Sequence, residues 1–244
     1  LQYGFMPNRS LTSQLLLCLN DWTKIISSKK SCFIVYLDFK KAFDTVCHSK
    51  LLCRLQSLGI DGQVLSWIRC YLSGRTQRVS ISGALSEPAD VSSGTMQGSI
   101  CGPILYLLYG NSLLDLLSAA DVSVYAYADD IKLYSDDPAK LQSALSIVEK
   151  WCQEWQLSLS VEKCSILLLG SSHETPLYLF DQALPFSESV RDLGITMDRK
   201  LSFNSHCFNL AKRVKGSCWT ISKCFTSGRV APLLKAYLTY IRPK

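Results

Sequence analysis

Residues 122–135 read VSVYAYADDIKLYS, and this stretch decides how the rest of the chain is interpreted. Two runs rich in β-branched and aromatic residues, 122–127 and 131–135, flank the tripeptide Ala-Asp-Asp. Runs of this composition separated by so few residues predict two strands joined by a tight hairpin. Strand alternation then puts Asp129 on the same face as two tyrosines, with Asp130 beside it in the turn.

Outward from this hairpin, the pattern alternates between helix and strand. Residues 31–39, SCFIVYLDF, are apolar on both faces, which is typical of a central strand, and Asp38 lies at its end. Apolar spacing predicts helices at 11–26, capped by Ser10 or Thr12, and at 48–58, 63–72, 104–117 after Pro103, 138–155 after Asp137, and from 204 onward. Further strands are predicted at 76–82, 163–169, 177–180 and 192–197. We therefore expect an α+β fold, an antiparallel sheet with helices packed on one face.

The composition excludes several classes of protein. With 48% hydrophobic and 19% charged residues among 244, the chain can bury a substantial core and is not disordered. Its 11 cysteines include no CxxC pair, which argues against a disulfide scaffold or a structural zinc site. The longest uncharged run, 91–114, is interrupted by glycine and proline and is not expected to cross a membrane. We expect an intracellular protein, in the nucleus and/or the cytoplasm.

The net charge of +6 is concentrated near the C-terminus. Residues 191–244 carry 11 basic and 2 acidic residues, a balance of +9, whereas residues 1–190 have a balance of −3. A basic region that follows a near-neutral body suits a phosphate backbone. Lys212, Arg213 and Lys215 are the candidate contacts, and the alternative is a solvated helical face.

The aspartates suggest a metal centre. Asp129 and Asp130 at a hairpin tip repel one another, and a third carboxylate brought near from Asp38 would raise that cost unless cations neutralise the group. Oxygen ligands of this kind favour two Mg²⁺ ions, with Mn²⁺ as an alternative, in a site for in-line phosphoryl transfer. The Asp-Asp pair taken alone is also compatible with a simple polar turn.

Three motifs in a fixed order carry a family resemblance. They are VYLDFKKAFD at 35–44, GTMQGSICGP at 94–103 and AYADDIKLY at 126–134. Together they resemble the reverse transcriptase domain of non-LTR (LINE-type) retrotransposons. The flanking segments QYGFMPNRS at 2–10 and VRDLGITMDRKLSF at 190–203 resemble further blocks of the same family.

The resemblance implies a polymerase palm with partial fingers and a partial helical thumb. Residues 1–30 would be a remnant of the fingers, and 31–170 the palm with its catalytic motifs. Residues 171–204 would form the primer-grip region, and 205–244 the truncated start of a basic thumb. Because the sequence begins at Leu1 instead of Met, we expect a fragment of a longer protein.

The resemblance also implies roles for individual residues. Asp38 and Asp129 would bind metal, with Asp130 in the same centre, and these three would be catalytic together with Lys163. Lys163 matches a lysine proposed to assist the pyrophosphate leaving group, although a lysine near the start of a strand could equally be solvated.

Nucleotide or template contacts are implied for Phe39, Phe43, Gln97 and Gly98. Phe43 matches an aromatic gate that would collide with a ribose 2′-hydroxyl, and its alternative role is core packing. A residue without Cβ, such as Gly98, lets backbone approach a ligand closely, although a plain helix-entry loop is the alternative.

The implied activity is RNA-directed DNA synthesis. The partners would be an RNA template, a DNA primer and deoxynucleoside triphosphates, with no membrane. One alternative is an inactive transposon remnant or a nucleic-acid-binding relic. A second is a related polymerase that copies RNA into RNA.

Overall fold

A computed structural model of the chain describes residues 1–170, 173–225 and 230–242. Two compact units, Leu1–Ser187 and Glu188–Lys244, are distinguished and are treated separately below. The predicted regions 171–204 and 205–244 include residues 171–172, 226–229 and 243–244, which lie outside the described residues. The division after Ser187 falls within the predicted primer-grip region.

The first unit mixes helices with short strands, as expected of an α+β protein. Its helices are α1 (Leu11–Ser27), α2 (His48–Ser57), α3 (Gly62–Leu72), α4 (Cys101–Ser118), α5 (Pro138–Trp155) and a 3₁₀ turn, η1 (Val161–Lys163). Its strands are β1 (Cys32–Leu37), β2 (Thr76–Gln77), β3 (Ser80–Ile81), β4 (Ala84–Leu85), β5 (Ala89–Asp90), β6 (Ser123–Tyr127), β7 (Asp130–Ser135), β8 (Ser165–Leu169), β9 (Tyr178–Leu179) and β10 (Gln182–Ala183).

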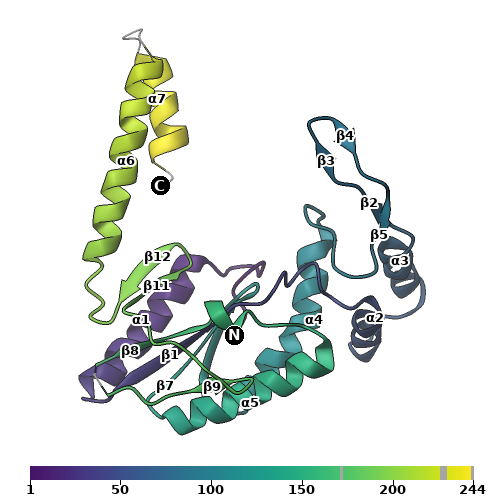
Figure 1. The fold of residues 1–244 in the computed structure, drawn as a ribbon, viewed down its shortest axis with the longest axis horizontal. Coiled ribbons are helices and arrows are strands. Elements are labelled where there is room, and N and C mark those ends of the chain that lie inside the picture. The colour runs from purple at the N-terminus through teal and green to yellow at the C-terminus, as the bar shows by residue number, and fades with distance from the viewer. Residues whose placement is uncertain (171–172, 226–229, 243–244) are drawn as a thin grey trace. The chain divides into compact units, whose positions relative to one another are not determined.

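Four strands form the central sheet in the order β6-β7-β1-β8, and every neighbouring pair is antiparallel (Figure 1). Leu37 at the end of β1 pairs with Ile131, and Tyr127 pairs with Asp130 across a two-residue turn. The predictions of an antiparallel sheet and of a tight hairpin are confirmed. One detail differs, because Asp130 is the first residue of β7 and only its neighbour Asp129 lies in the turn.

Helices cover both faces of this sheet. Val35 and Leu133 face the main core, which also contains side chains of α4 and α5. Tyr134 points the other way, and Trp22 of α1 packs edge-on against it with ring centroids 5.9 Å apart. Figure 1 shows α1 and α5 on opposite sides of the sheet. We expected helices on one face, and α1 adds a second layer because β1 is apolar on both faces.

Side-chain caps explain where the helices begin. Ser10 and Ser13 cap α1 reciprocally, since each hydroxyl accepts a hydrogen bond from the other residue's N–H at 3.0 Å. Asp137 Oδ1 accepts a hydrogen bond from the Ala139 N–H, 2.8 Å, at the start of α5. α4 begins before the predicted residue 104, because Ser99 Oγ accepts the Gly102 N–H at 2.9 Å and satisfies an early amide.

A two-stranded ribbon follows α3. β2 pairs with β5 and β3 with β4, so residues 76–90 form one long hairpin that projects from the end of α3 (Figure 1). The predicted strand at 76–82 is therefore present in two pieces. Val79 lies between them and donates its N–H to Ser86 Oγ, 2.9 Å, instead of to a strand carbonyl.

The second unit contains β11 (Ser189–Asp192), β12 (Ile195–Asp198), α6 (Asn204–Cys224), α7 (Val230–Ala236) and a π-helical turn, η2 (Tyr237–Ile241). The prediction of one strand at 192–197 is wrong, because Leu193 and Gly194 adopt φ values of 47° and 91° and turn the chain into a hairpin. Among the described residues of both units, no helix is long and apolar enough to span a bilayer.

Candidate active site

The register of the sheet brings Asp38 to the hairpin turn that holds Asp129. Leu37 is the last residue of β1 and pairs with Ile131, so the next residue along β1 faces Asp130 at the start of β7. Burial raises the pKa of the Asp129 carboxyl, and the negative charge of Asp38 raises it further. The strand ends therefore gather carboxylates from two distant parts of the sequence.

The segment that leads into β8 fixes the peptide of Asp38 on both sides. Ser160 donates its N–H to the Asp38 carbonyl, 2.8 Å, and the Asp38 N–H donates to Cys164 Sγ, 3.4 Å. Lys163 Nζ lies 3.7 Å from Asp38 Oδ1. Because the lysine side chain is 70% exposed, this ion pair adds little stability, but it keeps an ammonium group beside the aspartate.

The donor set fits a hard divalent cation. Asp38 and Asp129 are partly exposed and Asp130 is exposed, so solvent reaches all three residues. Within the described residues, no group of three or more His, Cys, Asp or Glu side chains is already arranged to hold a metal. A close pair of carboxylates suits Mg²⁺, which is commonly held by one or two carboxylates and completes its shell with water and substrate phosphates.

The N-terminal segment holds the turn that carries Asp129. Gln2 Oε1 accepts the Ala128 N–H at 2.9 Å, and Gln2 Nε2 donates to the Ala128 carbonyl at 3.2 Å. Ala128 has φ 57°, a left-handed conformation that is unfavourable for a residue with a Cβ. A Cβ on Gly4 would lie 2.4 Å from the Ala128 nitrogen, so only glycine allows this close approach.

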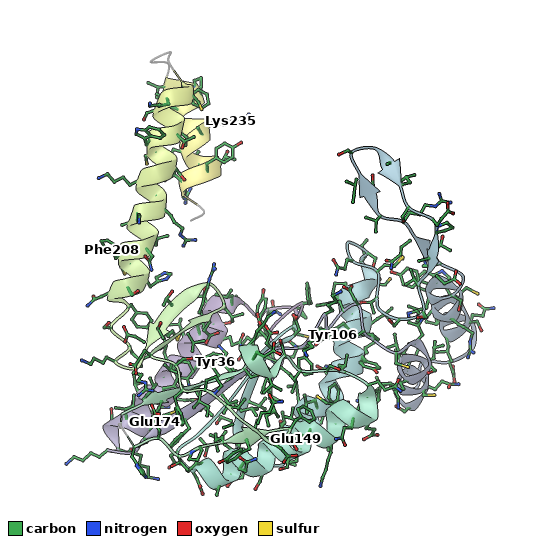
Figure 2. The ribbon with its side chains drawn as sticks, in the orientation of Figure 1. Tyr36, Tyr106, Glu149, Glu174, Phe208 and Lys235 are labelled. Atoms are coloured by element: carbon green, nitrogen blue, oxygen red, sulfur yellow. The ribbon has the colours of Figure 1, made fainter. Side chains whose placement is uncertain are left out.

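An aromatic cluster borders the carboxylates. The Phe43 ring stacks on Tyr106 with centroids 4.3 Å apart and meets Phe5 edge-on at 6.5 Å. Tyr106 projects from α4 (Figure 2), and its pKa is raised by burial and then by the charges of Asp129 and Asp130. Phe43 is only half-buried, so its geometry is compatible both with core packing and with a ring edge that meets a ligand.

Phe39 differs from Phe43 in its environment. Its side chain is 6% exposed and packs against Trp151 with ring centroids 6.3 Å apart. A nucleotide contact at this position would therefore use the backbone and not the ring.

The loop before α4 is tied to the segment that follows β1. Gln97 Nε2 donates to Asp44 Oδ1 at 2.9 Å, and His48 Nε2 lies 2.8 Å from the Gly94 carbonyl oxygen. A Cβ on Gly94 would be 2.7 Å from the Asp44 carbonyl oxygen, so the two segments make backbone contact. Gly98 has φ 81° and open space on its Cβ side. Gln97 is thus exposed but oriented, next to a backbone that a ligand can approach.

In the second unit, α6 presents an exposed stripe of aromatic and basic side chains. Its members are spaced by four, three, four and four residues, which is one helical face. They are Phe208 (Figure 2), Lys212, Lys215, Trp219 and Lys223. Lys223 Nζ lies 4.4 Å above the Trp219 ring. Arg213, the third predicted phosphate contact, lies about 100° around the helix from Lys212 and is not part of this α6 stripe.

Residues 1–236 match the protein family described as reverse transcriptase (RNA-dependent DNA polymerase). The chain belongs to this family. The order of the motifs around Asp38, Gln97 and Asp129 agrees with that membership, and the resemblance to the reverse transcriptase domain is confirmed.

Relatives of this reverse transcriptase domain occur in non-LTR retrotransposons. The RNA-directed DNA polymerase from mobile element jockey of Drosophila melanogaster is 26% identical over 238 residues, which are 91% of this chain and 26% of that protein. The 115 kDa protein in type-1 retrotransposable element R1DM of the same species is 34% identical over 230 residues, 88% of this chain and 21% of the relative. The chain thus spans about a quarter of the length of these relatives.

Solved telomerase structures share the fold of this reverse transcriptase domain. Apo telomerase from Candida tropicalis, truncated from its C-terminal domain, matches with a TM-score of 0.57 at 14% identity, over 83% of this chain and 40% of that one. Candida tropicalis telomerase in complex with an RNA fragment matches with a TM-score of 0.58 at 10% identity, over 85% and 37%. The α+β palm fold expected from the sequence is thereby confirmed.

Four residues that organise the candidate site were not predicted. Gln2 and Gly4 lie in the QYGF segment, whose resemblance to a family block was noted without any role, and the spacing of glutamine and glycine was the available signal. Asp44, which orients Gln97, lies at the end of VYLDFKKAFD. Cys164 gives no signal in the sequence, because its hydrogen bond to the Asp38 peptide depends on the folded register.

Proposed function

We propose that this chain carries the catalytic palm of an RNA-directed DNA polymerase. It would extend the 3′-hydroxyl of a DNA primer with deoxynucleotides, copying an RNA template in the presence of Mg²⁺, with Mn²⁺ as a substitute. In this assignment residues 31–170 are the palm, 1–30 part of the fingers, 171–204 the primer grip and 205–244 the start of the thumb.

One observation carries the proposal. Asp38 and Asp129 come from separate motifs, yet the register of β1 and the β6–β7 hairpin brings their carboxylates close enough for one charge to shift the other's pKa. A stable fold avoids placing like charges together unless a cation compensates them. Membership of the reverse transcriptase family supports nucleotidyl transfer as the chemistry served by this arrangement.

Each side chain of the candidate site has a separate role in nucleotidyl transfer. The primer 3′-oxygen forms a bond to the α-phosphorus of the nucleotide, and the bond to the bridging oxygen breaks, releasing pyrophosphate. Asp38 and Asp129, with Asp130 nearby, would hold two divalent cations, which would supply positive charge to stabilise the entering and leaving oxygens. Lys163 keeps an ammonium group beside Asp38, where it can offset charge on the leaving group.

Substrate contacts follow from the exposed groups. Gln97 and Gly98 present an oriented amide and an accessible backbone to the template and incoming nucleotide, and Phe43 offers a ring edge to the sugar. In the second unit, Lys212 and Lys215 of the α6 stripe would contact phosphates, with Arg213 as a weaker candidate. Phe39 would contribute only backbone.

Primer extension tests the proposal. The 244-residue chain is incubated with an RNA template, a labelled DNA primer, deoxynucleotides and Mg²⁺. Extension that disappears with EDTA and in Asp129→Asn is expected. No extension by the wild-type chain, with primer–template still bound, would favour the alternative of an inactive nucleic-acid-binding relic, which the exposed basic and aromatic α6 stripe also supports. Preferential incorporation of ribonucleotides would favour the polymerase that copies RNA into RNA.

A further inference from the structure

An open cavity of about 960 Å³ lies beside Gln97 in the first unit. Its walls come from residues 41–48 after β1, 71–77 at the end of α3, and 90–97 before α4. Its charged lining residues are two basic ones, Lys41 and Arg75, and two acidic ones, Asp44 and Asp90. Most of the other lining residues are uncharged and polar. The volume is at the upper end of ordinary ligand pockets. Of the residues that line it, only Gln97 was given a substrate contact above.

A stack of side chains on α3 leads into this cavity. Trp67 and Tyr71 lie one helical turn apart, with ring centroids 5.5 Å apart and planes inclined by 20°. The Arg75 guanidinium lies 4.9 Å from the Tyr71 ring centroid, and its Nε donates to the Tyr71 carbonyl. Trp67 is 55% exposed, so the outer face of the stack is open to solvent. We call Trp67, Tyr71 and Arg75 the α3 stack.

This combination matches the chemistry of an unpaired nucleic-acid strand. Any base has a π-face that can stack on an exposed aromatic ring, whereas a base within a duplex presents only its edge. A guanidinium held over a ring adds a cation for the phosphates between stacked bases. The polar hydroxyls and carboxylates of the cavity can accept hydrogen bonds from base amino groups and from 2′-hydroxyls.

We propose that the cavity and the α3 stack bind an unpaired stretch of RNA. At least one base stacks on Trp67, and the adjoining phosphates face Arg75 and Lys41. The inference rests on the proposed function in one respect: if the chain copies RNA, the bound strand is the part of the template that has not yet been copied. This strand would meet the loop before α4 at Gln97, which lies in the cavity wall.

Binding of a fluorescein-labelled 12-nucleotide RNA of mixed sequence to the full 244-residue chain tests this inference. Fluorescence anisotropy should show about a tenfold weaker affinity for Trp67→Ala, since stacking on one aromatic ring contributes this order of affinity. Trp67→Phe should restore most of the loss. Tyr178→Ala removes an aromatic ring that is 47% exposed on β9 of the same unit and should bind as wild type does. Thermal melting of each variant verifies folding.

Failure of the inference differs from failure of the proposed function. Trp67→Ala affinity within twofold of wild type, no RNA binding by the wild-type chain, or equal competition by double-stranded RNA would each overturn the α3 stack as a single-strand site. Asp129→Asn should abolish extension and leave this binding intact. If wild type fails to extend a primer but binds RNA in a Trp67-dependent manner, the catalytic proposal falls and the binding site stands.

Discussion

The backbone around Asp38 and Asp129 is fixed by hydrogen bonds from two other segments, whereas α6 in the second unit buries none of its residues. In the first region, hydrogen bonds hold the peptide groups of Asp38 itself and of Ala128, the neighbour of Asp129. The second presents exposed lysine side chains and aromatic rings on one helical face. Nucleotidyl transfer demands near-attack geometry, where an error of 1 Å can cost a hundredfold in rate. Phosphate contacts act largely through charge and contribute mainly to affinity. The contrast therefore predicts that changes in the first region alter rate, and changes in α6 alter affinity.

The largest effect is expected at the turn. Asp129→Ala should lower Mg²⁺-dependent primer extension at least about a hundredfold, because a carboxylate of the proposed metal centre is lost. Primer–template binding, measured by anisotropy, should stay within about twofold. Asp181→Asn changes an aspartate in the turn between β9 and β10 and should extend as wild type does. Undiminished extension by Asp129→Ala would remove the basis of the metal assignment.

Gln2→Ala should lower kcat about tenfold or more with little change in KM. The Ala128 N–H would lose its partner, and the turn would relax from its left-handed conformation. Gln2→Glu keeps the acceptor and should give an intermediate rate. Gln153→Ala, on an exposed position of α5, is the matched control. If Gln2→Ala and Gln2→Glu lose the same amount of kcat and the same amount of folding stability, Gln2 would have a role in folding only.

Phe43→Ala should raise the ratio of ribonucleotide to deoxynucleotide incorporation by about tenfold, as expected when a steric barrier to one substrate is removed. Single-nucleotide extension with each substrate gives the ratio. If the ring only packs on Tyr106, both substrates should slow alike, and the ratio should not change. Tyr178→Ala again serves as the control.

In α6, Lys212→Gln combined with Lys215→Gln should weaken primer–template binding several-fold and reduce the slope of log K against log salt by about two. The maximal extension rate at saturating primer–template should be unchanged. Arg213→Gln removes the same charge outside the α6 stripe and should leave the slope nearly unaltered. A larger slope change from Arg213→Gln would show that the phosphates meet another face of the helix.

The smallest effect concerns stability without metal. Burial raises the pKa of Asp129 in the folded state, so the folded chain favours the protonated carboxyl. The protonated carboxyl therefore stabilises the fold fully at a pH below the unfolded-state pKa. This stabilisation is lost as the pH rises through the folded-state pKa. At neutral pH the carboxylate therefore destabilises the fold. In EDTA, Asp129→Asn should unfold at a slightly higher urea concentration than wild type. The increase in the free energy of unfolding should be at most about 1 kcal/mol, because solvent screens a partly exposed group. Mg²⁺ should stabilise wild type more than the variant.

The sequence was sufficient for the parts of the fold that depend on local pattern. The 122–135 hairpin, the central position of β1 and the caps at Ser10 and Asp137 follow from alternation and side-chain chemistry, and the structure contains them. The break inside 192–197 was not predictable in the same way. Leu193-Gly194 is not the usual Asn-Gly turn, and the neighbouring residues continue a strand pattern.

The candidate site shows the same division. Asp38 and Asp129 could be paired from their motifs, because strand ends of one sheet meet at one edge. Gln2 and Cys164 act through hydrogen bonds between segments distant in sequence, and no periodicity reports such contacts. The α3 stack was hidden for another reason: in the sequence, Trp67 and Tyr71 are indistinguishable from the apolar face of an ordinary amphipathic helix.

The inner position of β1 also affects how the chain must be made. Its two neighbouring strands are formed by residues 130–135 and 165–169. After Leu37 has been added, the ribosome must therefore add more than a hundred further residues before both edges of β1 can pair. At about 5–20 residues per second, synthesis of that stretch takes roughly ten seconds. During this interval at least one edge of a strand that is apolar on both faces is unpaired, which exposes the nascent chain to aggregation.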